Sequence, residues 1–263
     1  MYQFFMYEYQ WMAYAGAIIS SAIGLVVFAL LAKKCKERPV RTVRSLRDMA
    51  GFLVIAAVID YVAFTLNGVY PGWRPVFNYV TLGSYLSFTM NAIANIFLLL
   101  FIRDVFFEDK NKKPLGLLAA MEIAVGPALV IIFFTGDPDW PLLALAVHVA
   151  SAMAIYIVLT RNAIVLRGRI KRDSSKQVEA HGLAYIALSG LFMLAALILF
   201  VSHEAIILVP IREYWTVTLG WILGAVGGVV VYLGFTPPEW LKARWASQVP
   251  ARKEKIVPDR AYS

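Results

Sequence analysis

The sequence contains little of the chemistry from which soluble enzymes are built. Its 263 residues include one cysteine, Cys35, which excludes an intrachain disulfide and a thiolate metal cluster. Of its three histidines, two (His181 and His203) fall near opposite ends of one predicted helix, so the three cannot meet at one metal or haem. No nucleophile and base are placed together by the sequence. We therefore predict no enzyme activity, no metal and no cofactor.

Lysine and arginine are nearly absent from seven long apolar stretches. A bilayer core is about 30 Å thick and a helix rises about 1.5 Å per residue, so about 20 apolar residues span it. A hydrophobic content of 60% and a mean hydropathy of +0.67 also indicate a membrane protein. The sequence therefore predicts an all-α, polytopic fold, a bundle of seven transmembrane helices at residues 12–33, 50–67, 79–102, 115–135, 141–165, 182–209 and 215–235.

Basic residues are also nearly absent from every second connection. The segments 33–47, 103–113, 161–176 and 242–260 hold 23 of the 25 Lys and Arg residues, and only Arg74 and Arg212 lie on the other side. Basic loops stay in the cytoplasm during insertion. We therefore expect the amino terminus outside and the carboxyl terminus inside. The same rule explains the net charge of +8, so we predict no binding to nucleic acid.

This pattern also predicts the organisation of the chain. Residues 1–11 form an outer segment, residues 12–235 form the membrane domain, and residues 236–263 form a cytoplasmic interfacial helix and tail. The extramembrane pieces are too short for a core of their own. We expect a multi-pass protein of the cell membrane whose surroundings are the lipid bilayer.

Three ionisable side chains lie well inside the predicted spans: Asp60, Glu122 and His148. Such groups are costly in hydrocarbon, so each is a candidate for function. A carboxyl group in a low dielectric takes up a proton unless an opposite charge or a cation pairs with it. A lone histidine such as His148 is more often a packing residue than a ligand.

The third span carries a stripe of polar residues. Ser87, Asn91 and Asn95 are spaced by four, which places them on one side of a helix. Amides facing lipid would lack hydrogen-bond partners, so this side must point inward. By their depth along the helices, we expect Asp60, Asn91, Asn95 and Glu122 to form one cluster between the second, third and fourth spans.

Two interpretations of this cluster stay open. It is either a proton, cation or polar-ligand site, or a hydrogen-bond network that holds the bundle together at about 1 kcal/mol per bond. Tyr185 and Ser189 lie one turn apart on the sixth span and are candidates for the same pocket.

The segment that leaves the seventh span has a distinctive sequence. Residues 232–245 read Tyr-Leu-Gly-Phe-Thr-Pro-Pro-Glu-Trp-Leu-Lys-Ala-Arg-Trp. Pro237 and Pro238 end the helix, and Trp240, Leu241 and Trp245 are expected to form the apolar face of a short interfacial helix. The run resembles the Gly-Phe-x-Pro-Pro-x-Trp-Leu exit from the seven-helix sensor region of some prokaryotic histidine kinases. The resemblance implies a sensor whose output passes through this segment to a separate partner protein.

Three functions therefore remain. The first is a receptor-like sensor that binds a small ligand or proton and signals to a cytoplasmic or membrane partner. The second is a non-catalytic subunit of a larger membrane complex, and the third is a small proton- or cation-linked transporter using Asp60 and Glu122. The seventh span carries small residues that let helices approach closely: Gly220, Gly224, Gly227 and Gly228. They pack either within the bundle, as we expect, or against another subunit, as the second function requires.

Overall fold

The computed structural model describes residues 2–69, 79–107, 113–135, 140–205 and 214–247, and no strand occurs among them. The all-α prediction is confirmed. The helices are α1 (Tyr2–Glu37), α2 (Arg41–Val69), α3 (Tyr79–Phe106), α4 (Lys113–Thr135), α5 (Trp140–Ile170), α6 (Gln177–Ala205), α7 (Tyr214–Phe235) and α8 (Glu239–Ser247), with a 3-10 turn η2 (Ser174–Lys176). Each predicted apolar stretch lies within one of α1 to α7, apart from residues 206–209, which lie outside the described residues.

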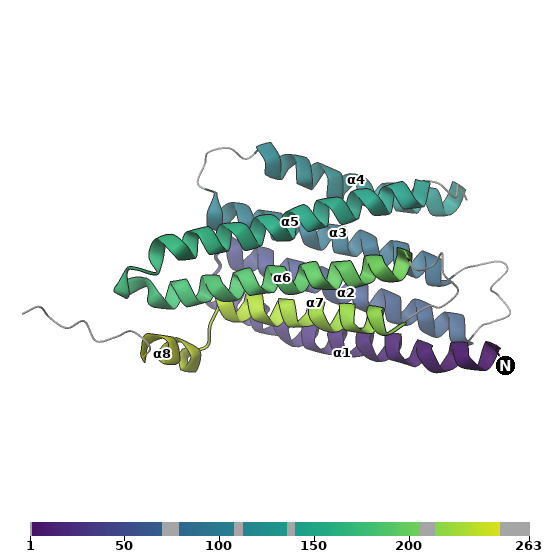
Figure 1. Cartoon of the computed structure of the whole chain (residues 1–263), viewed down its shortest axis with the longest axis horizontal. Helices are drawn as coiled ribbons and strands as arrows, with labels where there is room; N and C mark the ends of the chain where they lie inside the picture. The colour runs from purple at the N-terminus through teal and green to yellow at the C-terminus, as the bar shows by residue number, and fades with distance from the viewer. Residues whose placement is uncertain (1, 70–78, 108–112, 136–139, 206–213, 248–263) are drawn as a thin grey trace, which may run out of the picture.

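The seven long helices lie side by side with their axes along one direction (Figure 1). Each packs on its neighbours in the chain, and α7 packs on α1, so that the seven form a closed ring. Contacts between α3 and α5 cross the interior. Because the ring is closed, side chains from distant segments of the sequence meet inside it.

Local signals explain where several elements end. Pro237 and Pro238 follow α7, and a proline ring cannot continue a helix. Between α5 and α6, the side chain of Asp173 accepts a hydrogen bond from the backbone N–H of Ser175 and caps the short turn η2. Pro127 lies inside α4, where it removes one backbone donor without ending the helix.

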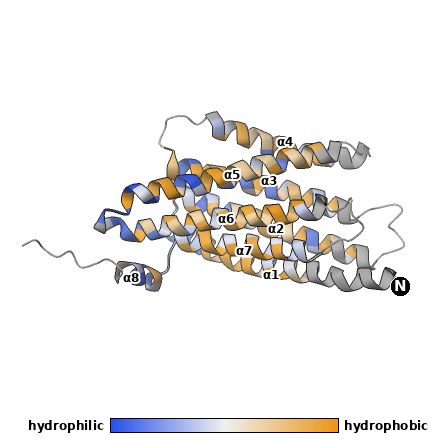
Figure 2. Ribbon diagram, viewed as in Figure 1, coloured by the Kyte–Doolittle hydropathy of each residue, from blue (hydrophilic) through white to orange (hydrophobic). Residues whose placement is uncertain are grey.

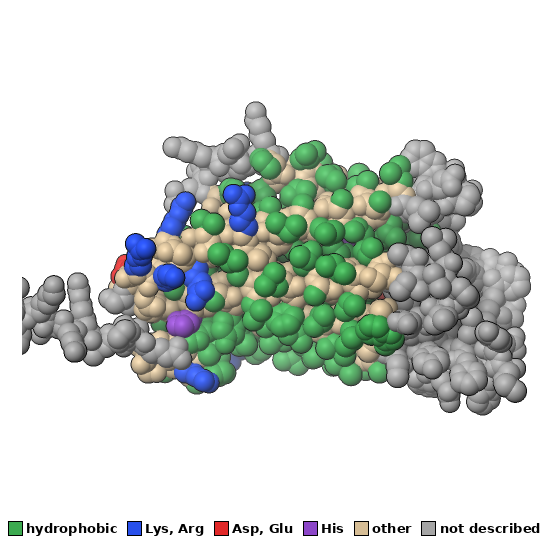
Figure 3. Space-filling view, in the orientation of Figure 1, with side chains coloured by type: hydrophobic (Ala, Val, Ile, Leu, Met, Phe, Trp, Pro, Cys, Tyr) green, Lys and Arg blue, Asp and Glu red, His purple; other side chains and the backbone are tan. Residues whose placement is uncertain are grey.

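The outer surface of the bundle is apolar along its middle. Among the described residues, five helices contain stretches long and apolar enough to cross a membrane: α1, α3, α5, α6 and α7. The described part of α4 contributes a shorter apolar stretch, Pro114–Leu129. Large hydrophobic side chains such as Leu25, Leu117 and Ile164 face outward (Figures 2 and 3). This surface suits lipid rather than water.

Charge is concentrated at one end of this surface. Figure 3 shows Lys and Arg side chains at the end of the bundle where α8 lies. They include basic residues in the last turns of α1 and α5: Lys34, Lys36, Arg167 and Arg169. The apolar belt and this basic end are therefore separate regions of the same surface.

The glycines of α7 pack inside the bundle. A methyl group at Gly234 would lie 2.7 Å from the carbonyl oxygen of Gly182, so α6 and α7 touch through their backbones there. At Gly227 the same addition would meet the side chain of Met193 at 3.1 Å. Larger residues at these positions would force the two helices apart. Gly220, Gly227 and Gly234 therefore serve the contact between α6 and α7, whereas a methyl group at Gly228 would meet nothing within 4 Å.

Candidate functional site

The most buried carboxyl group among the described side chains is that of Glu122 on α4, which is 1% exposed. Its Oε1 atom accepts hydrogen bonds from Asn95 Nδ2 at 3.1 Å and from Ser151 Oγ at 2.7 Å. Its Oε2 atom lies 2.8 Å from His148 Nδ1. A carboxyl group removed from water needs such partners. Here they come from the two helices that flank α4.

The helices bring these partners together through their periodicity. His148 and Ser151 are three residues apart on α5, so they project from the same side of the helix. Further along α5, Tyr156 donates a hydrogen bond from its hydroxyl group to Asn95 Oδ1 at 3.1 Å. Asn95 thus joins Glu122 to Tyr156. We call the five residues Asn95, Glu122, His148, Ser151 and Tyr156 the Glu122 cluster.

The Glu122–His148 contact can hold a proton. At 2.8 Å, one hydrogen lies between Oε2 and Nδ1, and it belongs either to the imidazole or to the carboxyl group. With the hydrogen on Nδ1, the imidazole donates a hydrogen bond to a carboxylate. With the hydrogen on Oε2, the carboxyl group donates to the imidazole. Asn95 and Ser151 both donate to the other oxygen of Glu122. The chemistry available here is proton binding and exchange.

One polar atom of the Glu122 cluster has no hydrogen-bond partner among the described residues. It is the Nε2 atom of His148, which is fully buried. The ring of Phe88 packs against the imidazole, with ring centroids 5.8 Å apart. No group of three or more His, Cys, Asp or Glu side chains in the described part of the chain is placed to hold a metal ion.

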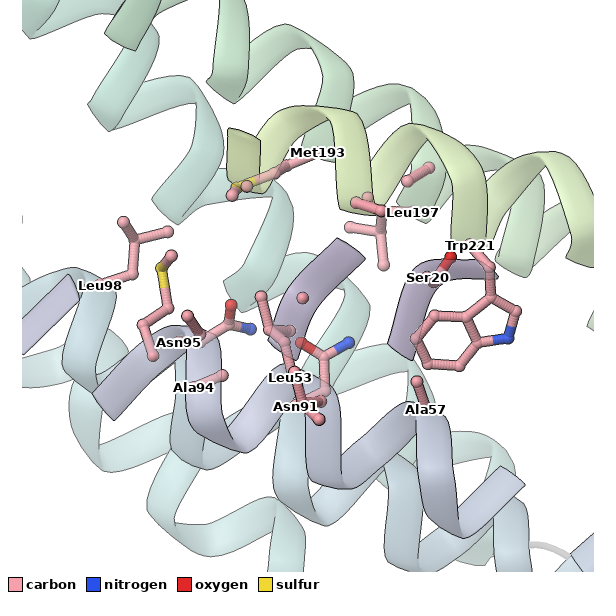
Figure 4. A pocket seen from close by; sticks show the side chains of 18 of the residues that line it. Ser20, Leu53, Ala57, Asn91, Ala94, Asn95, Leu98, Met193, Leu197 and Trp221 are labelled. Carbon is pink, nitrogen blue, oxygen red and sulfur yellow. The ribbon is translucent and has the colours of Figure 1, made fainter. Parts of the chain in front are cut away.

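A cavity of about 90 Å³ lies beside the Glu122 cluster. Its walls come from α1, α2, α3, α6 and α7, with Tyr156 contributed by α5 (Figure 4). Most of the lining is aliphatic or aromatic, and Asn95 and Tyr156 are members of both the lining and the cluster. The cavity and the proton-holding pair are therefore connected through two hydrogen-bonded side chains.

Three polar residues of the cavity wall have unused hydrogen-bonding atoms. Within the described residues, Ser20 Oγ, Asn91 Oδ1 and Trp221 Nε1 are buried without a partner. They come from α1, α3 and α7 and line the same cavity, in which Figure 4 shows Ser20 beside Trp221 and Asn91 between Trp221 and Asn95. Buried polar atoms are rarely left unpaired, so this grouping needs an explanation.

The structure brings together only part of the predicted site. Asn95 and Glu122 are bonded to each other, and His148 joins them. Asn91 instead lines the cavity, one turn away on α3. Asp60 is half-buried on α2 and is not among the cavity-lining residues, and the three hydrogen bonds of Glu122 described above come from α3 and α5.

The remaining predicted residues lie elsewhere. Ser87 is buried on α3, one turn from Asn91. Ser189 is buried on α6 and donates its hydroxyl group to the carbonyl oxygen of Ile186 at 2.7 Å. Tyr185 packs on the ring of Trp245 in α8, with centroids 5.2 Å apart. Tyr185 thus belongs to the contact between α6 and α8.

Sequence reasoning missed four residues of the site: Ser20, Ser151, Tyr156 and Trp221. Two of them carried a readable signal, because Ser151 and Tyr156 lie three and eight positions after His148 and share its side of α5. Ser20 and Trp221 are isolated in apolar helices, and nothing in their spacing indicates that they lie side by side where α1 packs on α7.

The exit segment forms α8, which docks on α6. Leu241 and Trp245 are buried, and Trp245 stacks on the ring of His181 with centroids 5.6 Å apart. Trp240 is 64% exposed, so of the three apolar residues predicted for this segment only Leu241 and Trp245 are buried. Residues 240 and 245 are five apart, which turns them to different sides of a helix.

The charged side of α8 faces outward. Glu239 and Lys242 form an ion pair of 2.7 Å, and this hydrogen bond holds the pKa of the Glu239 carboxyl below its usual value. Glu239 also feels the positive charges of Lys34 and Arg38 at the end of α1. The helix therefore presents both charge and an exposed indole ring next to the basic end of the bundle.

Comparison of the chain with known protein families, with curated proteins and with solved structures finds no match. Its function has to be argued from the Glu122 cluster, the cavity and the docked helix α8.

Proposed function

We propose that this chain is a seven-helix sensor of the cell membrane that binds a small ligand or a proton within the bundle and signals to a separate protein. The observation that carries this proposal is the connection of an internal cavity to a buried proton-holding pair through Asn95 and Tyr156. A ligand that contacts either side chain alters the hydrogen bonds that Glu122 receives.

The proposal places all seven long helices in the bilayer. Five of them are long and apolar enough by themselves, and α2 and α4 pack between these within one ring. The cluster of Lys and Arg at the end where α8 lies supports an inside location for that end, with the amino terminus outside (Figure 3). The basic end and α8 then face the cytoplasm, where a partner is available.

Helix α6 supplies a route from the cavity to α8. Met193 and Leu197 line the cavity, and His181 and Tyr185 hold Trp245 at the other end of the same helix. A shift of α6 caused by an occupied cavity therefore reaches α8 directly. A ligand drives such a shift only if it binds one arrangement of the bundle more tightly than the other.

Partner capture tests the signalling part of the proposal. We expect one cytoplasmic or membrane signalling protein to be retained by the full chain in mild detergent and to be lost with Trp240→Ala, because that indole is exposed on α8. The matched control is Leu117→Ala, an equally exposed apolar residue on α4. We expect it to retain the partner.

Two results would contradict this part. Capture that is equal in both variants would separate the partner from α8. Recovery of a stoichiometric set of membrane subunits, insensitive to Trp240→Ala, would instead favour the role of a non-catalytic subunit.

A second candidate, a proton-linked transporter, is favoured by the buried Glu122–His148 contact alone. Its test is proton flux into proteoliposomes. A transporter would lose this flux with Glu122→Gln and with Asp60→Asn, whereas a sensor would show no flux in the unmodified chain.

A further inference from the structure

The cavity has a chemical character that restricts what occupies it. None of the residues that line it carries a charged side chain. A charged ligand would therefore enter a low dielectric without a counter-charge, which is strongly unfavourable. The occupant of this cavity is electrically neutral.

The unused polar atoms define the rest of the ligand. Asn91 Oδ1 can only accept a hydrogen bond, Trp221 Nε1 can only donate one, and Ser20 Oγ can do both. Ser20 is 7% exposed, and Figure 4 shows it beside Trp221, with the nitrogen of the Asn91 amide toward that ring and its oxygen on the side of Asn95. A group that both donates and accepts satisfies this end of the cavity. Hydroxyl and primary amide groups have this property.

The opposite end of the cavity is apolar. Leu98 and Met193 lie there in Figure 4, away from Ser20 and Trp221. Asn95 lies between the two ends, with its amide already bonded to Glu122 and Tyr156. The volume of about 90 Å³ is of the order that holds a small ring or a short branched chain. The ligand is therefore amphipathic as well as neutral.

We propose that the cavity binds a small neutral alcohol or primary amide, with its polar group at Ser20 and Asn91 and its hydrocarbon part toward Leu98 and Met193. This proposal rests on the proposed function, because it takes the cavity to be the ligand site of the sensor. It adds the chemical class of that ligand.

The test measures thermal unfolding of the full chain in lipid nanodiscs against increasing concentrations of defined probes. Cyclopentanol and isobutyramide are the neutral polar probes, methylcyclopentane lacks the polar group, and isobutyrate and isobutylammonium carry charge at similar size. A ligand that binds only the folded state raises the unfolding temperature as its concentration increases. We expect cyclopentanol or isobutyramide to raise it saturably and the charged probes to leave it unchanged.

Two variants separate binding in the cavity from partition into lipid. Gly228 is in the cavity wall and a Cβ atom there meets nothing within 4 Å, so Gly228→Leu is the variant designed to fill the cavity. Gly116→Leu is the matched control, because a Cβ there also meets nothing within 4 Å but the position is exposed on α4. We expect the saturable shift to vanish in the first variant and to persist in the second.

Asn91→Leu tests the polar group and keeps the test valid if Gly228→Leu does not fold. Loss of one hydrogen bond weakens binding about three- to tenfold, so the apparent dissociation constant of the neutral polar probe should rise by that factor. The affinity for methylcyclopentane should not fall.

Three results would overturn the inference. They are no saturable shift with either neutral polar probe, a shift equally large with methylcyclopentane, or a shift that survives both Gly228→Leu and Asn91→Leu. The first would indicate a cavity filled by water only.

The proposed function fails separately. If the probes bind as expected but leave partner capture unchanged, the ligand class stands and the signalling role does not. If partner capture depends on Trp240 while no probe binds, the signalling role stands and the ligand class does not.

Discussion

Asn91 and Asn95 are two asparagines one turn apart on α3, and both line the cavity, but only Asn95 is also part of the Glu122 cluster. Asn95 donates to Glu122 and accepts from Tyr156, so both ends of its amide are used. Asn91 points its Oδ1 atom into the wall of the cavity, where no described residue bonds it. In a low dielectric, a bonded amide stabilises the bundle and an unbonded one destabilises it. The two asparagines therefore differ in whether the amide oxygen is paired inside the protein.

The largest expected effect on stability comes from replacing Glu122, the centre of the Glu122 cluster. Glu122→Leu leaves Asn95, His148 and Ser151 without their shared partner, and we expect the free energy of unfolding to fall by about 3 kcal/mol. Reversible unfolding in mixed micelles measures it. Ile123→Ala, at the exposed neighbouring position, is the control and should change little. An equal loss in both variants would mean that the cluster contributes nothing specific.

The second prediction makes the same substitution, asparagine to leucine, at Asn95 and at Asn91. Asn95→Leu breaks two hydrogen bonds, so we expect it to lower the free energy of unfolding by about 1.5 kcal/mol. Asn91→Leu removes an amide oxygen that has no partner among the described residues, so we expect it to raise the same quantity by about 1 kcal/mol. The measurement is made on ligand-free protein. If the free energy of unfolding changes in the same direction in both variants, the two asparagines do not differ in this way.

Neighbouring glycines on α7 give a smaller contrast. Gly228 lines the cavity, and Gly228→Ala should raise the free energy of unfolding by about 0.8 kcal/mol, because alanine favours the helix and its Cβ meets nothing within 4 Å. Gly227→Ala should lower it, since that Cβ would lie 3.1 Å from Met193. Equal stabilisation by both changes would show that α6 and α7 are not tightly packed there.

The smallest expected effect concerns the hydrogen bond between Tyr156 and Asn95. Tyr156→Phe removes only the hydroxyl group that donates to Asn95, and we expect a loss of about 0.6 kcal/mol. In the Asn95→Leu background the same change should have no further effect, because the acceptor is already gone. A double-mutant cycle measures this coupling. Additive losses would indicate that Tyr156 and Asn95 act independently.

Much of the fold could be predicted because it depends on local chemistry. The predicted apolar stretches form helices among the described residues, five of them long and apolar enough to cross a membrane, and Pro237 and Pro238 follow the end of α7 as expected. The inward face of α3 followed from the spacing of Asn91 and Asn95, since amides in hydrocarbon must find partners inside the bundle. The pairing of Asn95 with Glu122 followed from their depth along adjacent helices.

What the sequence alone determined, then, is that helices form, where the apolar part of each one lies, and which sides are polar. Helical period and side-chain polarity are properties of short segments, so one chain suffices to read them. Only the tertiary structure decided that His148 and Tyr156 complete the Glu122 cluster, that Asn91 faces Ser20 and Trp221 across a cavity, and that Trp245 docks on α6 while Trp240 does not. These outcomes depend on the rotation of each helix about its axis, which is set by packing between helices distant in the sequence.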